Sequence, residues 1–379
     1  MAENKTTIQR KGKEGTLSLS VSSNFDDDRP VYIAGNFNAW QLPDEKYRLH
    51  KVGKGRYRFE FSDISNLPPL LEYKYAKGDW EGRELTMYGE EIENRHLLSN
   101  IGFKAEQIGR WRTNGLGYSP DFLPKIQVLD EAFEIPQLIR TRRISALLPF
   151  DYETSGKNYP VLYLQDGQNL FDDYAPFGNW AIDKKLAALA ELGIGDVIVV
   201  AIDHAEADRV KEFTPGIGGN LGKGEGKKYV RFLADTLKPY VDKHFRTIPD
   251  RTHTGIGGSS MGGLISIYAG LMYPEVYGRL LIFSPSLWAA PNIHFHAINF
   301  EEAHDTRVYI YGGEGESKTM VPNIKKFQQA IQQQGSAANI EFDLSIDPKG
   351  QHNEARWGKE FPRAIAWLFF NKSSEENKA

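Results

Sequence analysis

A serine flanked by glycines carries the clearest chemical signal in this chain. Residues 258–262 read Gly-Ser-Ser-Met-Gly, so Ser260 has a glycine two positions before it and two positions after it. A strand-like segment precedes this pattern, and a helix-like run with small residues on one face follows it. Side chains at the flanking positions would collide in such a tight turn, which holds the serine strained and exposed. We therefore predict that Ser260 is a nucleophile.

A serine nucleophile needs a base that accepts its proton. His352 lies in the polar loop 349–354, between a strand-like segment and the last expected helix. Its place fits a chain in which the nucleophile comes first, the acid second and the histidine last. We predict that His352 is the base. His294 and His296 form an H-x-H pair, but no carboxylate or third histidine lies nearby at ligand spacing. The pair is interpreted as part of an ordinary loop, and no metal site is predicted.

The acid that orients the histidine is expected just after the strand-like segment 308–311. Glu314 and Glu316 both lie there, in Gly-Gly-Glu-Gly-Glu-Ser. A carboxylate at such a strand end can orient an imidazole and stabilise its cation. The alternative is that either glutamate only caps the helix expected to begin near Met320.

An oxyanion hole requires two backbone N–H groups that point at the developing negative charge. Met261, the residue after the nucleophile, is expected to supply one of them. The loop 164–171, which follows an early strand, is expected to supply the other from Gln168, since Gly167 permits a close backbone approach. The alternative is a plain turn around Asp166 and Gly167.

Two regions of the chain differ in their apolar pattern, and 379 residues suffice for about two domains. Residues 15–102 contain short segments that alternate apolar and polar side chains, separated by Gly, Pro, Asn and Asp, which predicts an antiparallel β-sandwich. From residue 141, nearly continuous apolar strands alternate with helical runs, which predicts a mostly parallel sheet covered on both faces. We predict an all-β domain at 1–112 and an α/β domain at 113–379. The strands expected in the α/β domain are 143–149, 161–164, 196–203, 279–284, 307–312 and 340–345, and the helices are 180–192, 229–244, 320–334 and 361–370.

Composition excludes several classes of function. The net charge is −4 and no run of basic residues occurs, so nucleic acid is not an expected partner. No apolar stretch approaches the roughly 20 residues of a membrane span. The chain has no cysteine, which excludes disulfides and thiolate chemistry. The glycine-rich stretch 216–226 lacks the spacing of a phosphate-binding loop, and no cofactor is predicted. The compartment stays open: the cytoplasm as the sequence stands, the periplasm or the exterior if a leader was removed.

Several sequence blocks together resemble the putative-esterase family of α/β-hydrolases. This family includes enterochelin-type siderophore esterases, esterase D, and the carbohydrate esterases that remove feruloyl or acetyl groups. The resemblance covers about residues 120–371. It implies a serine carboxylesterase in which Ser260 and His352 are catalytic, and it aligns the acid with Glu316. The blocks are Asp166-Gly-Gln-Asn-Leu-Phe-Asp, Glu212-Phe-Thr-Pro, Gly258-Ser-Ser-Met-Gly-Gly, Ser284-Pro-Ser-Leu-Trp, Gly313-Glu-Gly-Glu-Ser and His352-Asn-Glu-Ala-Arg-Trp.

The first domain carries a second resemblance, to immunoglobulin-like starch- and glycogen-binding modules. It rests on Gly35-Asn-Phe-Asn-Ala-Trp, Tyr73-Lys-Tyr-Ala-Lys-Gly-Asp-Trp and Glu93-Asn-Arg. In those modules two tryptophans stack on sugar rings while a lysine and an asparagine bind the hydroxyls. The resemblance thus implies a glycan site at Trp40, Lys74, Trp80 and Asn94. The alternative is a packing domain in which Trp40 closes the core.

The sequence as a whole predicts a two-domain serine esterase, and the first domain favours acylated carbohydrate, such as acetyl or feruloyl sugars, as the substrate. A siderophore trilactone is the second substrate class that we consider. Two further hypotheses concern other classes of protein. One is an acyltransferase of the same fold, and the other is a glycan-binding protein whose hydrolase domain is idle.

Overall fold

The chain folds into two compact units, Met1–Ser119 and Pro120–Ala379. We describe them from a computed structural model that covers residues 16–216, 221–293, 305–333 and 340–370. The domain boundary predicted after residue 112 lies within the segment that follows strand β9, a few residues before this division. Within the described ranges, no helix is long and apolar enough to cross a membrane.

The first unit is a β-sandwich. One sheet has the order β3-β4-β1-β8 and the other has the order β2-β5-β7, while β6 and β9 form a small additional pair. The strands are β1 (Leu17–Ser23), β2 (Val31–Gly35), β3 (His50–Gly53), β4 (Arg56–Phe61), β5 (Leu70–Lys77), β6 (Glu84–Leu85), β7 (Arg95–Leu98), β8 (Phe103–Ile108) and β9 (Arg110–Trp111).

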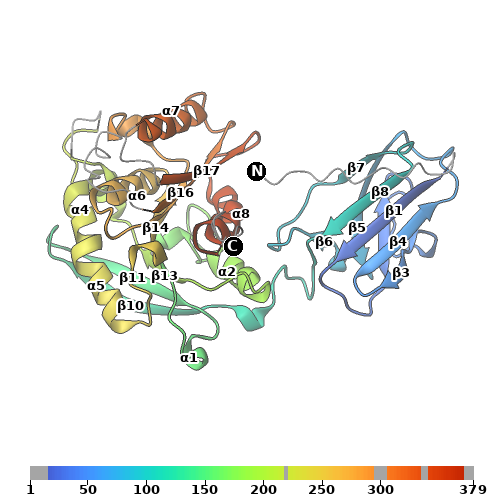
Figure 1. Ribbon diagram of the computed structural model, residues 1–379, viewed down its shortest axis with the longest axis horizontal. Helices are drawn as coiled ribbons and strands as arrows, with labels where there is room; N and C mark the ends of the chain where they lie inside the picture. Colours follow the sequence, from blue (N-terminus) through green and yellow to red (C-terminus); the bar gives the residue numbers. More distant parts are fainter. Residues whose placement is uncertain (1–15, 217–220, 294–304, 334–339, 371–379) are drawn as a thin grey trace. The chain divides into compact units, whose positions relative to one another are not determined.

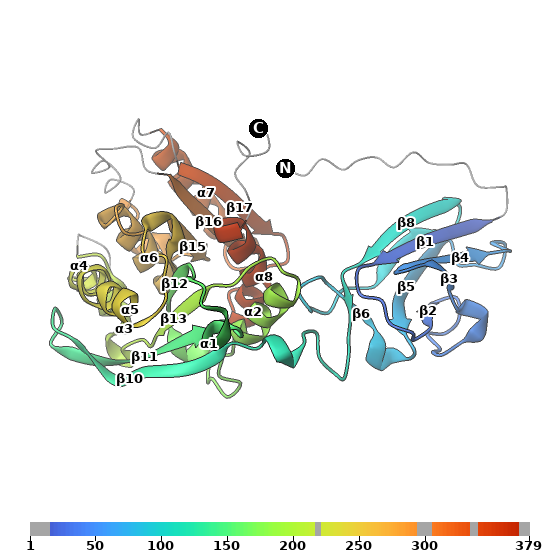
Figure 2. The ribbon, with the colours of Figure 1, turned by 60° about the horizontal axis from the view of Figure 1, so that its bottom comes forward.

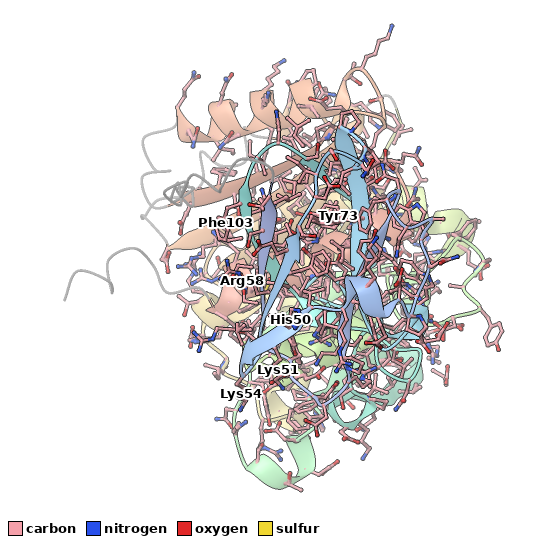
Figure 3. All side chains as sticks on the ribbon, turned by 90° about the vertical axis from the view of Figure 1, so that its right-hand side faces the viewer. His50, Lys51, Lys54, Arg58, Tyr73 and Phe103 are labelled. Atoms are coloured by element: carbon pink, nitrogen blue, oxygen red, sulfur yellow. The ribbon has the colours of Figure 1, made fainter. Side chains whose placement is uncertain are left out.

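The alternating pattern read from the sequence decides which side chains enter this core. On β4, Tyr57, Phe59 and Phe61 are buried, and the residues between them are exposed. Arg58 therefore faces outward, next to its cross-strand partner His50 on β3 (Figure 3). Apolar residues of β1, β2, β4, β5 and β7 belong to one buried cluster, so the two sheets pack face to face.

The second unit is built around an eight-stranded sheet. Its order is β10-β11-β13-β12-β14-β15-β16-β17, and all pairs are parallel except β10–β11 and β11–β13. This is the mostly parallel sheet that the sequence predicts. The strands are β10 (Lys125–Ile135), β11 (Arg140–Leu148), β12 (Val161–Gln165), β13 (Ile198–Ile202), β14 (Thr254–Ser259), β15 (Arg279–Phe283), β16 (Thr306–Gly313) and β17 (Ile340–Asp347).

Helices cover both faces of this sheet. Figures 1 and 2 show α2 and α8 on the face opposite α4, α5 and α6. A π-helical turn, Leu233–Leu237, joins α4 to α5 where the sequence predicts one helix over 229–244. The helices are α1 (Tyr152–Ser155), α2 (Ile182–Glu191), α3 (Arg209–Phe213), α4 (Gly226–Phe232), α5 (Lys238–His244), α6 (Met261–Met272), α7 (Met320–Gln332) and α8 (Glu354–Ile365).

Two elements differ from the sequence-based expectation. The sequence does not predict strand β10, because most of its side chains are exposed at the sheet edge and irregular pairing around Asp130 interrupts its apolar alternation. Helix α8 begins at Glu354 rather than at residue 361, because Asn353 caps it by accepting a hydrogen bond from the Arg356 N–H at 3.1 Å. The early start places this helix directly after His352.

Candidate active site

Ser260 lies on a sharp turn between β14 and α6. Its backbone has φ 56° and ψ −121°, a conformation that a residue with a side chain rarely adopts. A Cβ atom at Gly258 would lie 2.9 Å from the backbone of Gly262, and one at Gly262 would lie 2.8 Å from the Asp166 carboxylate. The close approach within the turn therefore requires glycine at 258, while at 262 a side chain would press on the Asp166 and Gln165 side chains of the neighbouring strand and loop.

His352 lies in the loop between β17 and α8, and its ring contacts Glu316. The distance from His352 Nδ1 to Glu316 Oε2 is 2.7 Å. Glu316 lies just past the end of β16, so the pair joins the ends of two neighbouring parallel strands. The His352 side chain remains 38% exposed, whereas the Glu316 side chain is only 1% exposed. This arrangement fixes the orientation of the imidazole while its other edge stays accessible.

Glu316 is held by three hydrogen-bond donors. Besides His352, the Ser284 hydroxyl and the Gly313 N–H each donate to Oε1 at 2.7 Å. Burial on its own raises the pKa of this carboxyl, but the hydrogen bonds from His352, Ser284 and Gly313 outweigh that effect. The net result is a pKa below the usual value of a glutamate, so Glu316 is ionised at neutral pH.

Glu314, the other glutamate proposed from the sequence, does not contact His352. Its side chain is exposed, and its backbone N–H donates to the Asp347 carbonyl at 3.0 Å. The structure thus brings Glu316, and not Glu314, to His352.

Ser284 and Trp357 support the histidine–glutamate pair, and the sequence assigned them no role. Ser284 has φ 46°, and its hydroxyl accepts a hydrogen bond from Trp357 Nε1 at 2.9 Å while donating to Glu316. The Trp357 ring meets the His352 ring edge-on, with centroids 4.9 Å apart. Both residues fall in sequence blocks that resemble the esterase family, but their contacts arise only when β15 and α8 come together.

The Ser260 hydroxyl has a different partner in this structure. It lies 3.3 Å from the Ser286 hydroxyl, and the Ser286 N–H donates to the Ser260 carbonyl at 3.0 Å. In the described part of the chain, Ser260 forms no hydrogen bond to His352. Ser260 and His352 nevertheless line the same cavity.

The two predicted oxyanion donors lie at the starts of helices. Met261 is the first residue of α6, and Gln168 lies in the short 3-10 helix Gly167–Asn169 that follows β12. N–H groups at a helix start lack intrahelical acceptors and are suited to bind negative charge. A Cβ atom at Gly167 would lie 3.0 Å from the Asp203 backbone nitrogen and 2.5 Å from Asp203 Oδ1, so glycine lets the loop lie close to the end of β13. The Gln168 side chain is tied down by the His204 backbone, accepting from its N–H at 2.9 Å and donating to its carbonyl at 3.2 Å.

Asp166 and Arg209 form a bidentate ion pair beside the turn that carries Ser260. Arg209 Nε and Nη2 lie 2.5 and 2.8 Å from the two carboxylate oxygens. Asp166 precedes the predicted oxyanion loop and has the left-handed backbone conformation, with φ 60°. Arg209 begins α3, which Glu212 anchors by accepting from Arg140 at 2.6 Å and from Arg142 at 2.7 Å. Arg209 of α3 thus fixes the Asp166 side chain, although α3 is not part of the loop that carries Asp166.

A cavity of about 780 Å³ opens over Ser260. Its wall joins the loop after β12, the start of α3, the turn at Ser260 and the start of α8. Burial lowers the pKa of His204 and raises the pKa of Glu354, which both line this cavity. The lining residues are Asp166, Gln168, Asn169, Pro176, Phe177, His204, Glu206, Arg209, Val210, Ser259, Ser260, His352, Glu354 and Trp357.

In the sandwich unit, Trp40 and Trp80 lie next to each other. Their ring centroids are 6.1 Å apart at an interplanar angle of 37°, and Trp80 Nε1 donates to the Trp40 carbonyl at 3.2 Å. Both indoles are half-buried, as are Lys74 and Asn94. Tyr73 pairs with Arg95 at the end of the β5–β7 ladder, and Lys74 and Asn94 are the next residues of the two segments.

Some residues singled out in the sequence lie outside the described ranges. They are His294, His296 and residues 217–220 of the glycine-rich stretch. Among the residues that are described, no group of three or more His, Asp or Glu side chains is arranged to hold a metal ion.

Comparison with known proteins agrees with this architecture. The family model described as "Putative esterase" matches residues 135–368. The chain belongs to this family of α/β-hydrolases, and it is a carboxylic ester hydrolase. The matched segment includes Ser260, Glu316 and His352.

Three curated relatives illustrate the range of the family. "Uncharacterized protein YbbA" of Bacillus subtilis (strain 168) is 27% identical over 244 residues, which cover 60% of this chain and 92% of that protein. The "Endo-1,4-beta-xylanase/feruloyl esterase" of Xylanibacter ruminicola is 27% identical over 232 residues, which cover 59% of this chain and 28% of that protein. The "Iron(III) salmochelin esterase" of Escherichia coli O6:H1 is 28% identical over 270 residues, covering 67% of this chain and 58% of that protein. This chain thus spans less than two thirds of the last two relatives.

Solved structures show the same fold. An "IroE-like serine hydrolase" from Shewanella oneidensis matches 65% of this chain and 80% of its own chain, with a TM-score of 0.53 and 20% identity. The "BES protein" from Bacillus cereus matches 65% of this chain and 95% of its own, with a TM-score of 0.53 and 17% identity.

Proposed function

We propose that this esterase hydrolyses its substrate through an acyl-enzyme formed on Ser260. The observation that carries this proposal is the contact between His352 and the buried, ionised Glu316, at the wall of a cavity that also contains the strained Ser260. Such a pairing is the arrangement by which a base is oriented toward a serine nucleophile.

The first half of the reaction forms the acyl-enzyme. Glu316 keeps the proton of His352 on Nδ1, so Nε2 is free to accept the proton of the Ser260 hydroxyl. Ser260 Oγ attacks the ester carbonyl carbon, and the N–H groups of Met261 and Gln168 stabilise the oxyanion. The His352 cation then donates its proton to the leaving alcohol, which departs as the C–O bond breaks.

The second half releases the acid. His352 removes a proton from water, the resulting hydroxide adds to the acyl carbonyl, and Ser260 Oγ leaves with the proton that His352 returns. Before the first step, the Ser260 hydroxyl must rotate from Ser286 toward His352. Catalytic hydrogen bonds are often long or misaligned without substrate and tighten when it binds.

For the substrate, we propose an acylated carbohydrate, with an acetyl or feruloyl acyl group. The charge of the cavity favours this class over a ferric siderophore. Asp166, Glu206 and Glu354 contribute carboxylates to the described lining, and Arg209, its one Lys or Arg residue, is already paired with Asp166. A ferric catecholate complex is anionic, so this lining would repel it, whereas a sugar ester is neutral.

For the sandwich unit, we propose that the indoles of Trp40 and Trp80 bind a sugar ring, with Lys74 and Asn94 at its hydroxyls. The support is that the two rings are adjacent and that all four side chains are partly exposed. A sugar presents an apolar C–H face that suits an indole, while polar groups fix its rotation. The esterase would thereby stay close to a glycan that carries its ester.

Hydrolysis of nitrophenyl acetate tests the catalytic proposal. Ser260→Ala should lower kcat by at least about 10³-fold without loss of folding, because no other covalent partner is available in the mechanism. Ser259→Ala is the matched control and should retain most activity, since neighbouring residues on the turn point in different directions. Near-normal activity of Ser260→Ala would end the mechanism. Acceleration of ester loss by added sugar would favour acyl transfer, and no activity of the wild-type protein on any ester would favour an idle hydrolase domain.

A further inference from the structure

A second histidine lines the cavity that contains Ser260. His204 lies two residues after the end of β13, and the proposed mechanism gives it no role. The residue is half-buried, and burial lowers its pKa, so the imidazole is neutral at neutral pH. A neutral imidazole carries one proton, and the nitrogen that holds it decides whether the ring offers the cavity a donor or an acceptor.

One hydrogen bond fixes the position of that proton. The Glu206 backbone N–H donates to His204 Nδ1 at 2.9 Å, so Nδ1 must present its lone pair. The proton of the neutral ring therefore lies on Nε2. Glu206 makes this contact with φ 46°, a conformation that residues with a side chain rarely adopt. Backbone strain of this kind persists only where the surrounding structure enforces it, and it is concentrated at functional sites.

The backbone of His204 is held in place as well. The Gln168 side chain binds both of its backbone groups, accepting from the N–H at 2.9 Å and donating to the carbonyl at 3.2 Å. Backbone and ring are thus both fixed, and a donor that is fixed before binding loses little freedom when a ligand accepts from it. Because Gln168 belongs to the predicted oxyanion loop, the histidine keeps a set position relative to that loop.

The Nε2 atom is unpaired and accessible. It has no hydrogen-bond partner among the described residues, and it is not one of the buried side-chain atoms that lack a partner. Nδ1 faces the loop of His204 itself, so the opposite edge of the ring, which carries Nε2, is the one available to the cavity. Asp166, Glu206 and Glu354 contribute carboxylates to the same lining, and Arg209 is already paired. His204 therefore adds a free donor to a lining rich in acceptors.

We propose that His204 is a specificity-determining residue whose Nε2–H donates a hydrogen bond to a substrate oxygen outside the ester group. This inference rests on the proposed esterase function. A sugar alcohol offers hydroxyl and ring oxygens as acceptors, and a feruloyl group offers its methoxy and phenol oxygens, so either part of the proposed substrate can supply the acceptor. An ester with hydrocarbon at this position is disfavoured, because the donor then loses its water without a replacement.

Two matched pairs of esters test this role in the full-length protein. Glucose 6-acetate and cyclohexylmethyl acetate differ in the oxygens of the alcohol, while methyl ferulate and methyl cinnamate differ in those of the acyl group. His204→Phe keeps an aromatic ring and removes the donor. In one pair, it should lower the kcat/KM ratio of the oxygenated ester to the hydrocarbon ester by about 5- to 10-fold, the size expected for one hydrogen bond. The pair that responds locates the acceptor on the alcohol or on the acyl group.

A second variant and a control separate recognition from folding. His204→Gln places an amide N–H₂ near the position of Nε2, so it should recover most of the ratio that His204→Phe loses. His50→Phe, which replaces an exposed histidine of the other unit, should leave both ratios unchanged. Equal losses on all four esters would overturn the proposal, because His204 would then act only through Gln168 or through folding. Unchanged ratios in both pairs would overturn it too.

The position of the proton can be measured without substrate. Heteronuclear NMR of the histidine rings, with the His204 signals assigned by their absence from His204→Gln, should show the proton on Nε2. A proton on Nδ1 would contradict the proposal, since the ring would then offer the cavity an acceptor. If Ser260→Ala hydrolyses the four esters normally, it is the catalytic proposal that fails, and the NMR result still tests the donor.

Discussion

Glu316 Oε2 lies 2.7 Å from His352 Nδ1, and the glutamate side chain is almost completely buried while the histidine is partly exposed. Burial alone would favour the neutral acid, but three donors reverse that preference and keep the carboxylate charged. A charged carboxylate in a dry site interacts strongly with an imidazolium at this distance. The pair is therefore suited to hold the histidine and to stabilise the cation formed during reaction.

Exchanging each glutamate for glutamine separates the two acid candidates. Glu316→Gln should lower kcat by at least about 100-fold, because the amide cannot stabilise the imidazolium and can turn its N–H₂ toward Nδ1, which selects the wrong tautomer. Glu314→Gln should change kcat less than about 2-fold, since its side chain is exposed and does not contact His352. Steady-state kinetics on one soluble ester measures both. The inverse result would reassign the acid, and two small effects would indicate a working Ser260–His352 dyad.

The pH dependence of stability can be tested at Asp203, beside Gly167. Burial raises the pKa of Asp203 to about 6, against an ordinary value of 3.8, and the nearby Arg143 and Arg142 only partly oppose it. Because the folded pKa is raised, the folded state retains the proton longer, and stability falls as pH rises from about 4 through about 6. Asp203→Asn removes this cost. Its Tm should exceed that of the wild type at pH 7.5 and should be close to it at pH 4, as measured by thermal unfolding at both values; an equal difference at both would contradict the assignment.

The local part of the site could be predicted from the sequence, and the distant contacts could not. The turn at Ser260 is marked by two glycines four positions apart, so its local geometry can be predicted from the sequence. The choice between Glu314 and Glu316 depends on which carboxylate meets a histidine more than 30 residues away, and only the pairing of β16 with β17 decides that. The Ser284–Trp357 hydrogen bond depends in the same way on the packing of α8 against β15.

The fold, like the site, could be predicted where the local sequence carries the pattern and not elsewhere. The parallel strands are buried on both faces, so their apolar runs are visible in the sequence, and all six strands expected in the second unit begin within three residues of an observed strand start. Strand β10 pairs through its backbone at an edge, and most of its side chains face solvent. Its apolar residues alternate only in two short stretches, Ile126–Val128 and Phe133–Ile135, which irregular pairing around Asp130 separates, so no continuous pattern marks the strand.

The third prediction concerns the Arg209–Asp166 ion pair, which a single and a double substitution can test. Arg209→Met leaves the Asp166 carboxylate, which is 8% exposed, uncompensated beside the turn of Ser260. We expect a loss of about 2 to 4 kcal/mol in the free energy of unfolding and a reduced kcat, because an unpaired buried charge is costly and lies near the developing oxyanion. Asp166→Asn in the same chain removes that charge and should recover part of both losses. Denaturant unfolding and kinetics measure them; a double variant worse than Arg209→Met would show that Asp166 needs its charge for another purpose.

The last prediction concerns the sandwich unit, where the contact between Trp40 and Trp80 has two explanations. If the two indoles bind sugar, Trp80→Ala should lower the affinity for a soluble starch oligosaccharide by about 1 to 3 kcal/mol, the usual cost of losing an aromatic anchor. The kcat on a small soluble ester should stay the same, because the Ser260 cavity is lined by residues of the other unit. Glycan titration followed by tryptophan fluorescence measures the affinity. Trp111→Phe is the control, because Trp111 is buried in the sandwich core, and it should alter Tm while leaving the glycan affinity in place. If the sandwich serves only for packing, oligosaccharide will leave the fluorescence of the wild-type protein unchanged, and Trp40→Ala will lower Tm through the loss of its contact with Trp80.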